Sequence, residues 1–296
     1  MNDPRQFGLS RRSLLRIAAT LPVAGGAALL RASEPDIKVP SYNDLTDQEE
    51  IEFGRKVGAE IESKVPILNV GPLEEYVNEI VIKLGRASKR PNMDYKAKVI
   101  NTMQINAFSI LGGHMYVYRG LLQFAQNEAE LAAVLGHEVG HVAGHHSATK
   151  LATQVQAKKL WEQVKHNVLL QNPVIKQIVE KLGGPLAILA MLRYERDQEF
   201  QADLFGFYEV FRCKWDPNGF ITIFDRLRQA TGGDPDLMKT IKSDHPPLGE
   251  RIARLQNEAK SVSMPAKMST DSLKFKAMKF ALSKVIAPPQ PPVKQG

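Results

Sequence analysis

The chain has 296 residues, of which 43% are hydrophobic and 24% are charged, so it is neither a disordered nor a fibrous sequence. Its formal net charge of +7 is unevenly placed, because residues 1–32 carry +4, residues 260–296 carry +6 and the body between them carries −3. That body has no basic cluster of the kind that contacts phosphates, so we expect no nucleic-acid partner.

The N-terminal segment has the pattern of an export signal. Arg11 and Arg12 precede an apolar run from Ile17 to Leu30, which resembles a bacterial twin-arginine signal. The run has about 14 residues, fewer than the roughly 20 that span a bilayer. We therefore predict that residues 1–33 direct the protein to the periplasm; the alternative is an uncleaved inner-membrane anchor.

After a polar linker over 34–44, the chain predicts a mainly helical domain over 45–260. Thr46 and Glu49 form a capping-box pattern, and Pro72 is suited to a first helical turn. The expected elements are helices over 47–64 and 72–87, strands over 95–100, 105–110 and 114–118, and helices over 128–149, 151–182, 185–213, 218–230 and 248–260. The fold class is α+β, mainly α, with one small sheet.

The C-terminal part, residues 261–296, is basic and ends in a proline-rich tail. Apolar residues from Leu273 to Val285 recur at helical spacing, with four lysines mostly elsewhere. Two interpretations remain open: a helix docked on the body, or a helix that contacts a membrane surface. The tail over 287–296 is expected to be disordered. The single cysteine, Cys213, excludes an intramolecular disulfide and is expected to be buried.

The chemistry of the chain is concentrated in His137-Glu138-Val-Gly-His141. The two histidines are four residues apart on a predicted helix, so both imidazoles can reach one tetrahedral Zn²⁺. Glu138 lies beside them, where a carboxylate can accept a proton from activated water. The surrounding sequence is strongly apolar, and burying unpaired polar groups there would be costly. The motif therefore predicts a metal site.

A catalytic zinc site needs a third protein ligand. His145 and His146 are close in sequence, but His145 lies about 12 Å along a continuous helix from His137, so it reaches the same ion only if the helix breaks. A third metzincin histidine would stand at position 147, which is Ser147. We therefore expect His145 and His146 to be surface residues or part of a second site.

Glu199 is the better candidate for the third ligand. Glu199 and Asp203 are four apart on a predicted helix, so they share one face. Glu199 can supply an oxygen to the metal, and Asp203 can accept the free ring N–H of a ligating histidine. Phe200, Ala202 and Leu204 flank the two acids and argue against a purely solvated helix face.

Together, His137-Glu138-x-x-His141 and Glu199-x-x-Ala202-Asp203 resemble the HtpX/BepA-like zinc endopeptidases, the family that also contains the CAAX prenyl proteases. The resemblance covers roughly residues 45–258. Further matching segments are Asn106-Ala107-Phe108, Gly112-Gly113-His114-Met115-Tyr116-Val117, and His245-Pro246-Pro247 followed by Arg251.

The resemblance implies a gluzincin-type fold, with the active-site helix beside a small sheet. It implies one zinc ion per chain, held by His137, His141 and Glu199, with Glu138 as base and acid and Asp203 behind the ligands. It also implies that the strand over 114–118 pairs with substrate. The residues implied to bind substrate are Asn106, Gly113, His114, Met115 and Tyr116.

The resemblance further implies that His245 and Arg251 stabilise the oxyanion, although in some relatives the matching histidine keeps the enzyme latent. Both roles for His245 stay open. Gln201 departs from the usual Glu-x-Glu-Ala-Asp pattern of the family, and no tetratricopeptide repeat follows residue 258.

The expected function is hydrolysis of misfolded or misassembled envelope proteins, the partners being those unfolded substrates and, through the C-terminal helix, a membrane surface. The rival is a zinc-stabilised scaffold or chaperone that does not cut.

Overall fold

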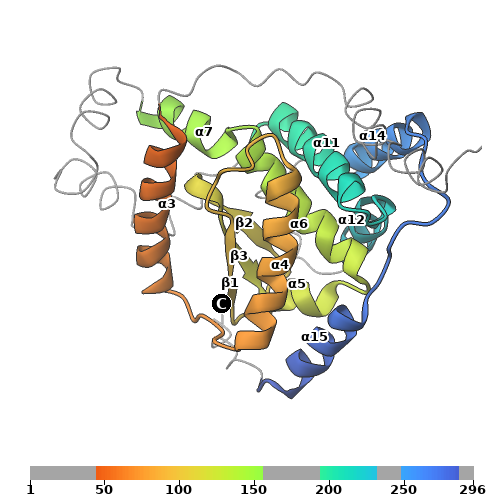
Figure 1. The fold of residues 1–296 in the computed structure, drawn as a ribbon, viewed down its shortest axis with the longest axis horizontal. Helices are drawn as coiled ribbons and strands as arrows, with labels where there is room; N and C mark the ends of the chain where they lie inside the picture. Colours follow the sequence, from red (N-terminus) through yellow and green to blue (C-terminus); the bar gives the residue numbers. More distant parts are fainter. Residues whose placement is uncertain (1–44, 156–193, 232–247, 287–296) are drawn as a thin grey trace, which may run out of the picture. The chain divides into compact units, whose positions relative to one another are not determined.

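The computed structural model describes residues 45–155, 194–231 and 248–286 (Figure 1). The chain forms two compact units, Met1–Asp36 and Ile37–Gly296, and every described residue belongs to the second. The expected export segment, the linker over 34–44, His245 and the proline-rich tail therefore lie outside the described residues.

Two helices precede the sheet, close to where the sequence predicts them. Helix α3 (Asp47–Glu62) begins at a capping box, in which the Glu49 backbone N–H donates to Thr46 Oγ1 and the Thr46 N–H donates to the Glu49 carboxylate. Helix α4 (Gly71–Ala87) has proline in its first turn. The buried face of α3 packs on a cluster that includes Ile110 and Tyr116.

The sheet has three short strands, β1 (Lys96–Ile100), β2 (Ala107–Ser109) and β3 (His114–Tyr118), in the order β1-β3-β2. β1 runs parallel to β3, whereas β2 runs antiparallel to it and pairs Phe108 with Tyr116. A 3₁₀ turn (Leu111–Gly113) connects β2 to β3, and Gly112 adopts a φ of +81°. β3 is therefore the central strand and β2 an edge strand.

Helix α5 (Arg119–Phe124), which the sequence patterns did not indicate, leads into α6 (Glu128–Ala143). The Asn127 side chain caps α6 by accepting from the Glu130 N–H at 2.9 Å. The expectation of one continuous helix over 128–149 is wrong. The chain turns at Gly144 and His145, where His145 adopts a left-handed φ of +56°, and α7 (His146–Val155) follows in a new direction.

Helices α11 (Arg196–Arg212) and α12 (Asn218–Thr231) pack on α6, and α14 (Leu248–Ser261) packs on α12 and α11 (Figure 1). The backbones of α6 and α11 approach closely: a Cβ on Gly140 would lie 2.3 Å from the Ala202 carbonyl oxygen, and one on Gly206 would lie 2.7 Å from the Gly136 carbonyl oxygen. Small residues at this crossing bring the two motif-bearing helices together. Among the described residues, no helix has the length and apolar content needed to cross a bilayer.

The C-terminal helix α15 (Leu273–Lys284) docks against α4 and α5. Its buried face consists of Phe275, Met278 and Leu282, whereas Leu273 is 85% exposed. The expectation of a helix docked on the body is thus confirmed, and Met278 and Leu282 of the expected stripe are buried, but Leu273 is not part of the packed face. Cys213 is buried as expected, and its thiol donates to the Lys83 carbonyl.

Candidate metal centre and active site

The two motif histidines face each other from successive turns of α6. Their Nε2 atoms are 3.0 Å apart, and neither side chain is more than 4% exposed. Burial is the main cause that lowers the pKa of both imidazoles below 6.5. Both rings are therefore neutral near pH 7, which is the form that ligates metals.

Glu199 approaches the same point from α11. Its carboxylate oxygens lie 3.5 Å from His137 Nε2 and 3.4 Å from His141 Nε2, and the residue is fully buried. Two ligands that are each about 2.1 Å from a tetrahedral ion lie about 3.4 Å apart, so these spacings suit a shared cation. The described residues with ligand atoms that converge in this way are His137, His141 and Glu199.

The charge of the site also suits a divalent cation. Three buried carboxylates, Glu138, Glu199 and Asp203, stand against one buried guanidinium, that of Arg251. With neutral histidines and ionised carboxylates, two negative charges remain, and one divalent cation would balance them. Uncompensated buried charge is costly, so the donor set and the charge both favour a metal here.

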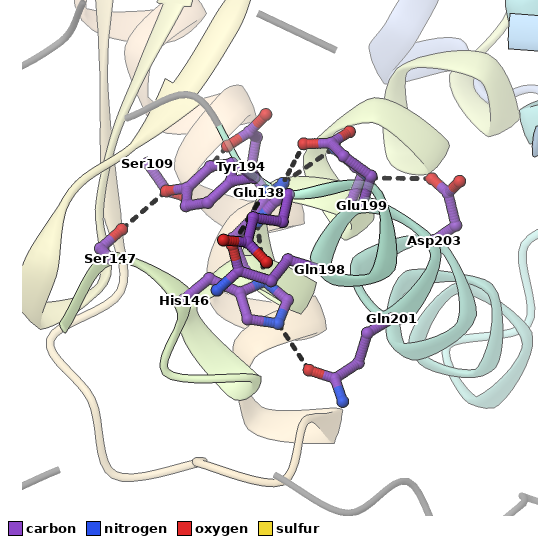
Figure 2. A network of polar contacts seen from close by, with 12 residues as sticks. Ser109, Glu138, His146, Ser147, Tyr194, Gln198, Glu199, Gln201 and Asp203 are labelled. Atoms are coloured by element: carbon purple, nitrogen blue, oxygen red, sulfur yellow. Dashed lines mark hydrogen bonds and ion pairs between the residues drawn. The ribbon is translucent and has the colours of Figure 1, made fainter. Parts of the chain in front are cut away.

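Glu138 lies beside the ligands and is oriented by the edge strand. Ser109 on β2 donates its hydroxyl to Glu138 Oε2 at 3.0 Å, and Glu138 is 3% exposed (Figure 2). The hydrogen bond holds the carboxylate next to the pair of histidines. The sequence motif places Glu138 on the helix, whereas the sheet orients its side chain.

An ion pair supports the His137 side of the site. His137 Nδ1 lies 2.9 Å from Asp203 Oδ1. Arg251 donates two hydrogen bonds to the Asp203 carboxylate, from Nε at 2.7 Å and from Nη2 at 2.6 Å. Burial alone would raise the pKa of Asp203, but Arg251 and its hydrogen bonds hold that pKa below 3.8. Since Nε2 faces the metal position, Nδ1 carries the ring proton and donates it to a carboxylate.

Arg251 also lies 3.2 Å from Glu199 through Nη1. The guanidinium is 2% exposed and is engaged with two carboxylates. These contacts make Arg251 a positioning residue for Asp203 and Glu199. Its expected contact with an oxyanion stays a prediction, and Arg251 lines a hollow beside Glu138.

A neutral chain of hydrogen bonds supports the His141 side. His141 Nδ1 lies 2.8 Å from His146 Nδ1, and His146 Nε2 lies 2.6 Å from Gln201 Oε1 (Figure 2). With Nε2 of His141 facing the metal position, His141 donates to His146, which in turn donates to Gln201. Burial lowers the pKa of His146 to about 3. The break after α6 turns His146 back onto His141, so the expectation of a surface or second-site role for His146 is wrong.

Tyr194 covers the same imidazole. Its ring stacks on His141 with centroids 3.7 Å apart, and its hydroxyl is 2.7 Å from Ser147 Oγ. Figure 2 shows Tyr194 between Ser109 and His146. The stacking and the hydrogen-bond chain together restrict the orientation of His141.

The expected substrate strand requires a correction. β3 is paired on both sides, with Met115 opposite Ala97 on β1 and opposite Ser109 on β2. His114, Met115 and Tyr116 are buried, and Gly113 is buried in the preceding turn. A strand with two neighbours has no edge left for a peptide, so 114–118 cannot add a substrate strand.

The edge that borders the site belongs to β2. The Tyr118 N–H donates to the Asn106 carbonyl and the Ile110 N–H donates to the His114 carbonyl, so the alternate residues Ala107 and Ser109 direct their backbone groups away from β3. Asn106 and Ala107 line a hollow of about 60 Å³ beside His137 and Glu138. Phe224, Leu227 and Leu248 form its apolar wall.

The sequence patterns did not indicate that Ser109, Tyr194 and Ser147 lie at the site. They also did not indicate that His146 and Gln201 support the metal-ligating His141. Ser109 and Tyr194 stand 29 residues before and 56 after Glu138, so no local spacing signals them. The sequence did contain a signal for a helix end just before His146, because Gly144 and His145 are residues that tolerate such an end.

Comparison with known proteins identifies the same region. The profile described as "Peptidase family M48" matches residues 72–259. This range includes both motif-bearing helices, the sheet and most of α14.

The similar proteins are named as proteases. The beta-barrel assembly-enhancing protease of Escherichia coli K12 is 25% identical over 231 residues, which are 76% of this chain and 47% of that protein. The mitochondrial metalloendopeptidase OMA1 of Schizosaccharomyces pombe is 27% identical over 185 residues, 62% of this chain and 52% of that protein. The metalloprotease YcaL of Escherichia coli K12 is 30% identical over 165 residues, 55% of this chain and 62% of that protein. The chain thus spans about half the length of the first relatives.

Proposed function

Because the chain belongs to peptidase family M48, we propose that it is a zinc-dependent endopeptidase that hydrolyses peptide bonds of misfolded or misassembled proteins in the bacterial cell envelope. The observation that carries this proposal is the convergence of His137, His141 and Glu199 beside the carboxylate of Glu138. Two neutral imidazoles and one carboxylate are a ligand set that zinc favours among divalent ions.

The bound cation would supply Lewis-acid polarisation of the peptide carbonyl and a lowered pKa of the attacking water. Glu138 then acts as the general base that accepts the proton of that water. It returns the proton to the nitrogen of the leaving amine. The Ser109 hydroxyl keeps Oε2 of Glu138 in place during both transfers.

The outward edge of β2 offers a place for the substrate backbone. Ala107 and Ser109 direct backbone groups away from β3, and Ala107 lies beside His137 and Glu138 in the same hollow. An extended peptide that pairs with this edge would pass the two side chains. Pairing through the backbone tolerates many side-chain sequences, which suits unfolded substrates.

The envelope location and the substrates rest on the sequence and on relatives. Arg11 and Arg12 before the apolar run support export through a twin-arginine signal. The name of the Escherichia coli relative associates that protein with the assembly of β-barrels. For this chain, misassembled envelope proteins are therefore the substrate class that we propose.

The decisive variant is Glu138→Gln, which keeps the shape of the side chain but removes the base. We expect kcat on an unfolded casein substrate to fall by about 10²–10⁴-fold. Zinc content, measured by elemental analysis, should stay at one ion per chain. Glu75→Gln makes the same chemical change on the exposed face of α4 and should leave both values unchanged.

Full activity of Glu138→Gln would refute the mechanism. The non-proteolytic scaffold predicts that Glu138→Gln and the wild-type protein suppress aggregation of unfolded substrate equally, and that neither yields cleavage products by mass spectrometry.

A further inference from the structure

The C-terminal helix α15 has apolar side chains on two opposite faces. Phe275, Met278 and Leu282 are buried against the body. Leu273 and Phe280 lie seven residues apart on the opposite face and are 85% and 66% exposed. A helix that only packs its inner face on a core has a polar outer face. Leu273 and Phe280 therefore have no role in packing α15 on the body.

Exposed large hydrophobic side chains gather in this segment. In the described ranges they are Met103, Leu273, Phe280 and Ile286. Three of these four lie within residues 273–286, where Ile286 follows the end of the helix and is 89% exposed. Single exposed apolar residues are ordinary on protein surfaces, but a cluster marks a contact surface.

Lysines surround this stripe. The side chains of Lys274 and Lys276 are 67% and 68% exposed, and Lys284 is exposed with its Nζ 5.0 Å from the centre of the Phe280 ring. Lys274 pairs with Glu79 and Lys276 lies 3.5 Å from Asp271, but such exposed pairs are weak. The outer face of α15 therefore combines apolar and cationic side chains.

The side chains of Lys279, Arg119 and Ser272 hold the helix in place. Lys279 Nζ donates to the carbonyls of Leu122, Gln123 and Ala125 at the end of α5. Arg119 donates to the carbonyls of Val285 and Ile286, and Ser272 caps the helix while it donates to Glu128. The outer face is thus presented by a docked helix and not by a loose end.

We propose that the outer face of α15, formed by Leu273, Phe280 and the flanking lysines, binds the surface of an anionic phospholipid membrane. Leu273, Phe280 and Ile286 would enter the boundary between headgroups and acyl chains, and the lysines would contact phosphates. Charge favours this partner over a second copy of the chain, because two such faces would bring lysines of like charge together. The surface is separate from the catalytic residues and does not depend on proteolysis.

Vesicle binding of the full chain tests the proposal. We expect sedimentation with phosphatidylglycerol–phosphatidylcholine vesicles and much weaker sedimentation with phosphatidylcholine alone. The double variant Leu273→Ser/Phe280→Ser should lower the partition coefficient at least tenfold, and Lys276→Gln/Lys284→Gln should lower it by about 25-fold, or fivefold per lysine. The matched control is Met103→Ser, which removes an exposed large hydrophobic residue outside residues 273–286 and should bind as the wild type does.

All of these variants keep the apolar run over 17–30, which could itself bind vesicles. A local probe on α15 distinguishes binding through α15 from binding through that run. Ser283→Cys on the exposed side of α15 can be labelled with an environment-sensitive dye, because the natural thiol of Cys213 is buried. Its emission should shift to the blue with anionic vesicles, whereas the same dye at Ser63→Cys on the exposed end of α3 should not respond.

Absence of a blue shift at position 283, or vesicle binding that both double variants leave unchanged, would overturn the proposal. A dimer in light scattering that Leu273→Ser/Phe280→Ser dissociates, without lipid binding, would instead assign the face to a second copy. Cleavage of a soluble peptide by these variants should equal that of the wild type, so failure here is distinct from failure of the proposed function.

Discussion

The two histidines of the metal centre have opposite kinds of support. His137 donates to Asp203, whose charge is paired with Arg251 on α14. His141 donates to His146, which donates to the neutral amide of Gln201. The ring N–H of His137 is thus bound by a charged group, whereas that of His141 is bound by a neutral one. The difference keeps the site at two negative charges, which one divalent cation balances.

The two sides also differ in how they are built. The charged side, which supports His137, joins α6, α11 and α14, which are far apart in sequence. The neutral side, which supports His141, uses His146 only five residues later, beyond the break after α6, and Gln201 on α11. Both sides depend on packing against α11, but only the charged side contains a buried ion pair. Substitutions should therefore affect global stability on the first side and metal affinity on the second.

The largest effect is expected from breaking the charged side. Asp203→Ala leaves Arg251 buried without its bidentate partner, and the converse holds for Arg251→Ala, so each variant should lose about 3–5 kcal/mol of unfolding free energy. Urea unfolding of the metal-free protein measures this loss. The double variant should lose less than the sum of the two; a loss equal to that sum would show that the pair is not coupled.

On the neutral side, His146→Leu removes the acceptor of the His141 ring proton. We expect zinc affinity, measured by chelator competition, to fall by about 10–100-fold, with the fold retained. His146→Asn keeps an oxygen near the position of Nδ1 and should lose less than about tenfold.

The matched control for this pair is His145→Asn, which alters the neighbouring histidine, and asparagine tolerates its left-handed backbone. Equal affinities of His146→Leu and the wild type would contradict the positioning role. So would an equal loss in His146→Leu and His146→Asn.

The smallest effect tests the charge difference itself. Gln201→Glu converts the neutral end of the chain into an acid and makes the His141 side resemble the His137 side. A carboxylate behind His146 should raise the basicity of the ligand and tighten zinc binding by about threefold to tenfold. Gln198→Glu adds the same charge to the first turn of α11 and should change affinity by less than twofold. Equal affinities of the two variants would show that the charge of residue 201 has no local effect on the metal site.

Local patterns predicted much of the fold. The capping box at Thr46 and the proline after Gly71 located the starts of α3 and α4, and the three strands lie where β-type runs occur. The order of the strands was not predictable in the same way, because it depends on which strand is paired twice. The family resemblance implied that 114–118 pairs with substrate, but this strand is paired on both sides, and β2 is an edge strand.

The sequence by itself determined that His137, Glu138 and His141 share one region of a helix and that Glu199 and Asp203 share one face of another. These are consequences of helical periodicity, which acts over a few residues. Only the tertiary structure decided that Gly140 and Gly206 allow the two helices to touch. It likewise decided that Arg251 pairs with Asp203 and Glu199. It also decided that Ser109 orients Glu138 and that His146 turns back to His141. Those contacts depend on packing between distant segments and on a helix break, neither of which periodicity encodes.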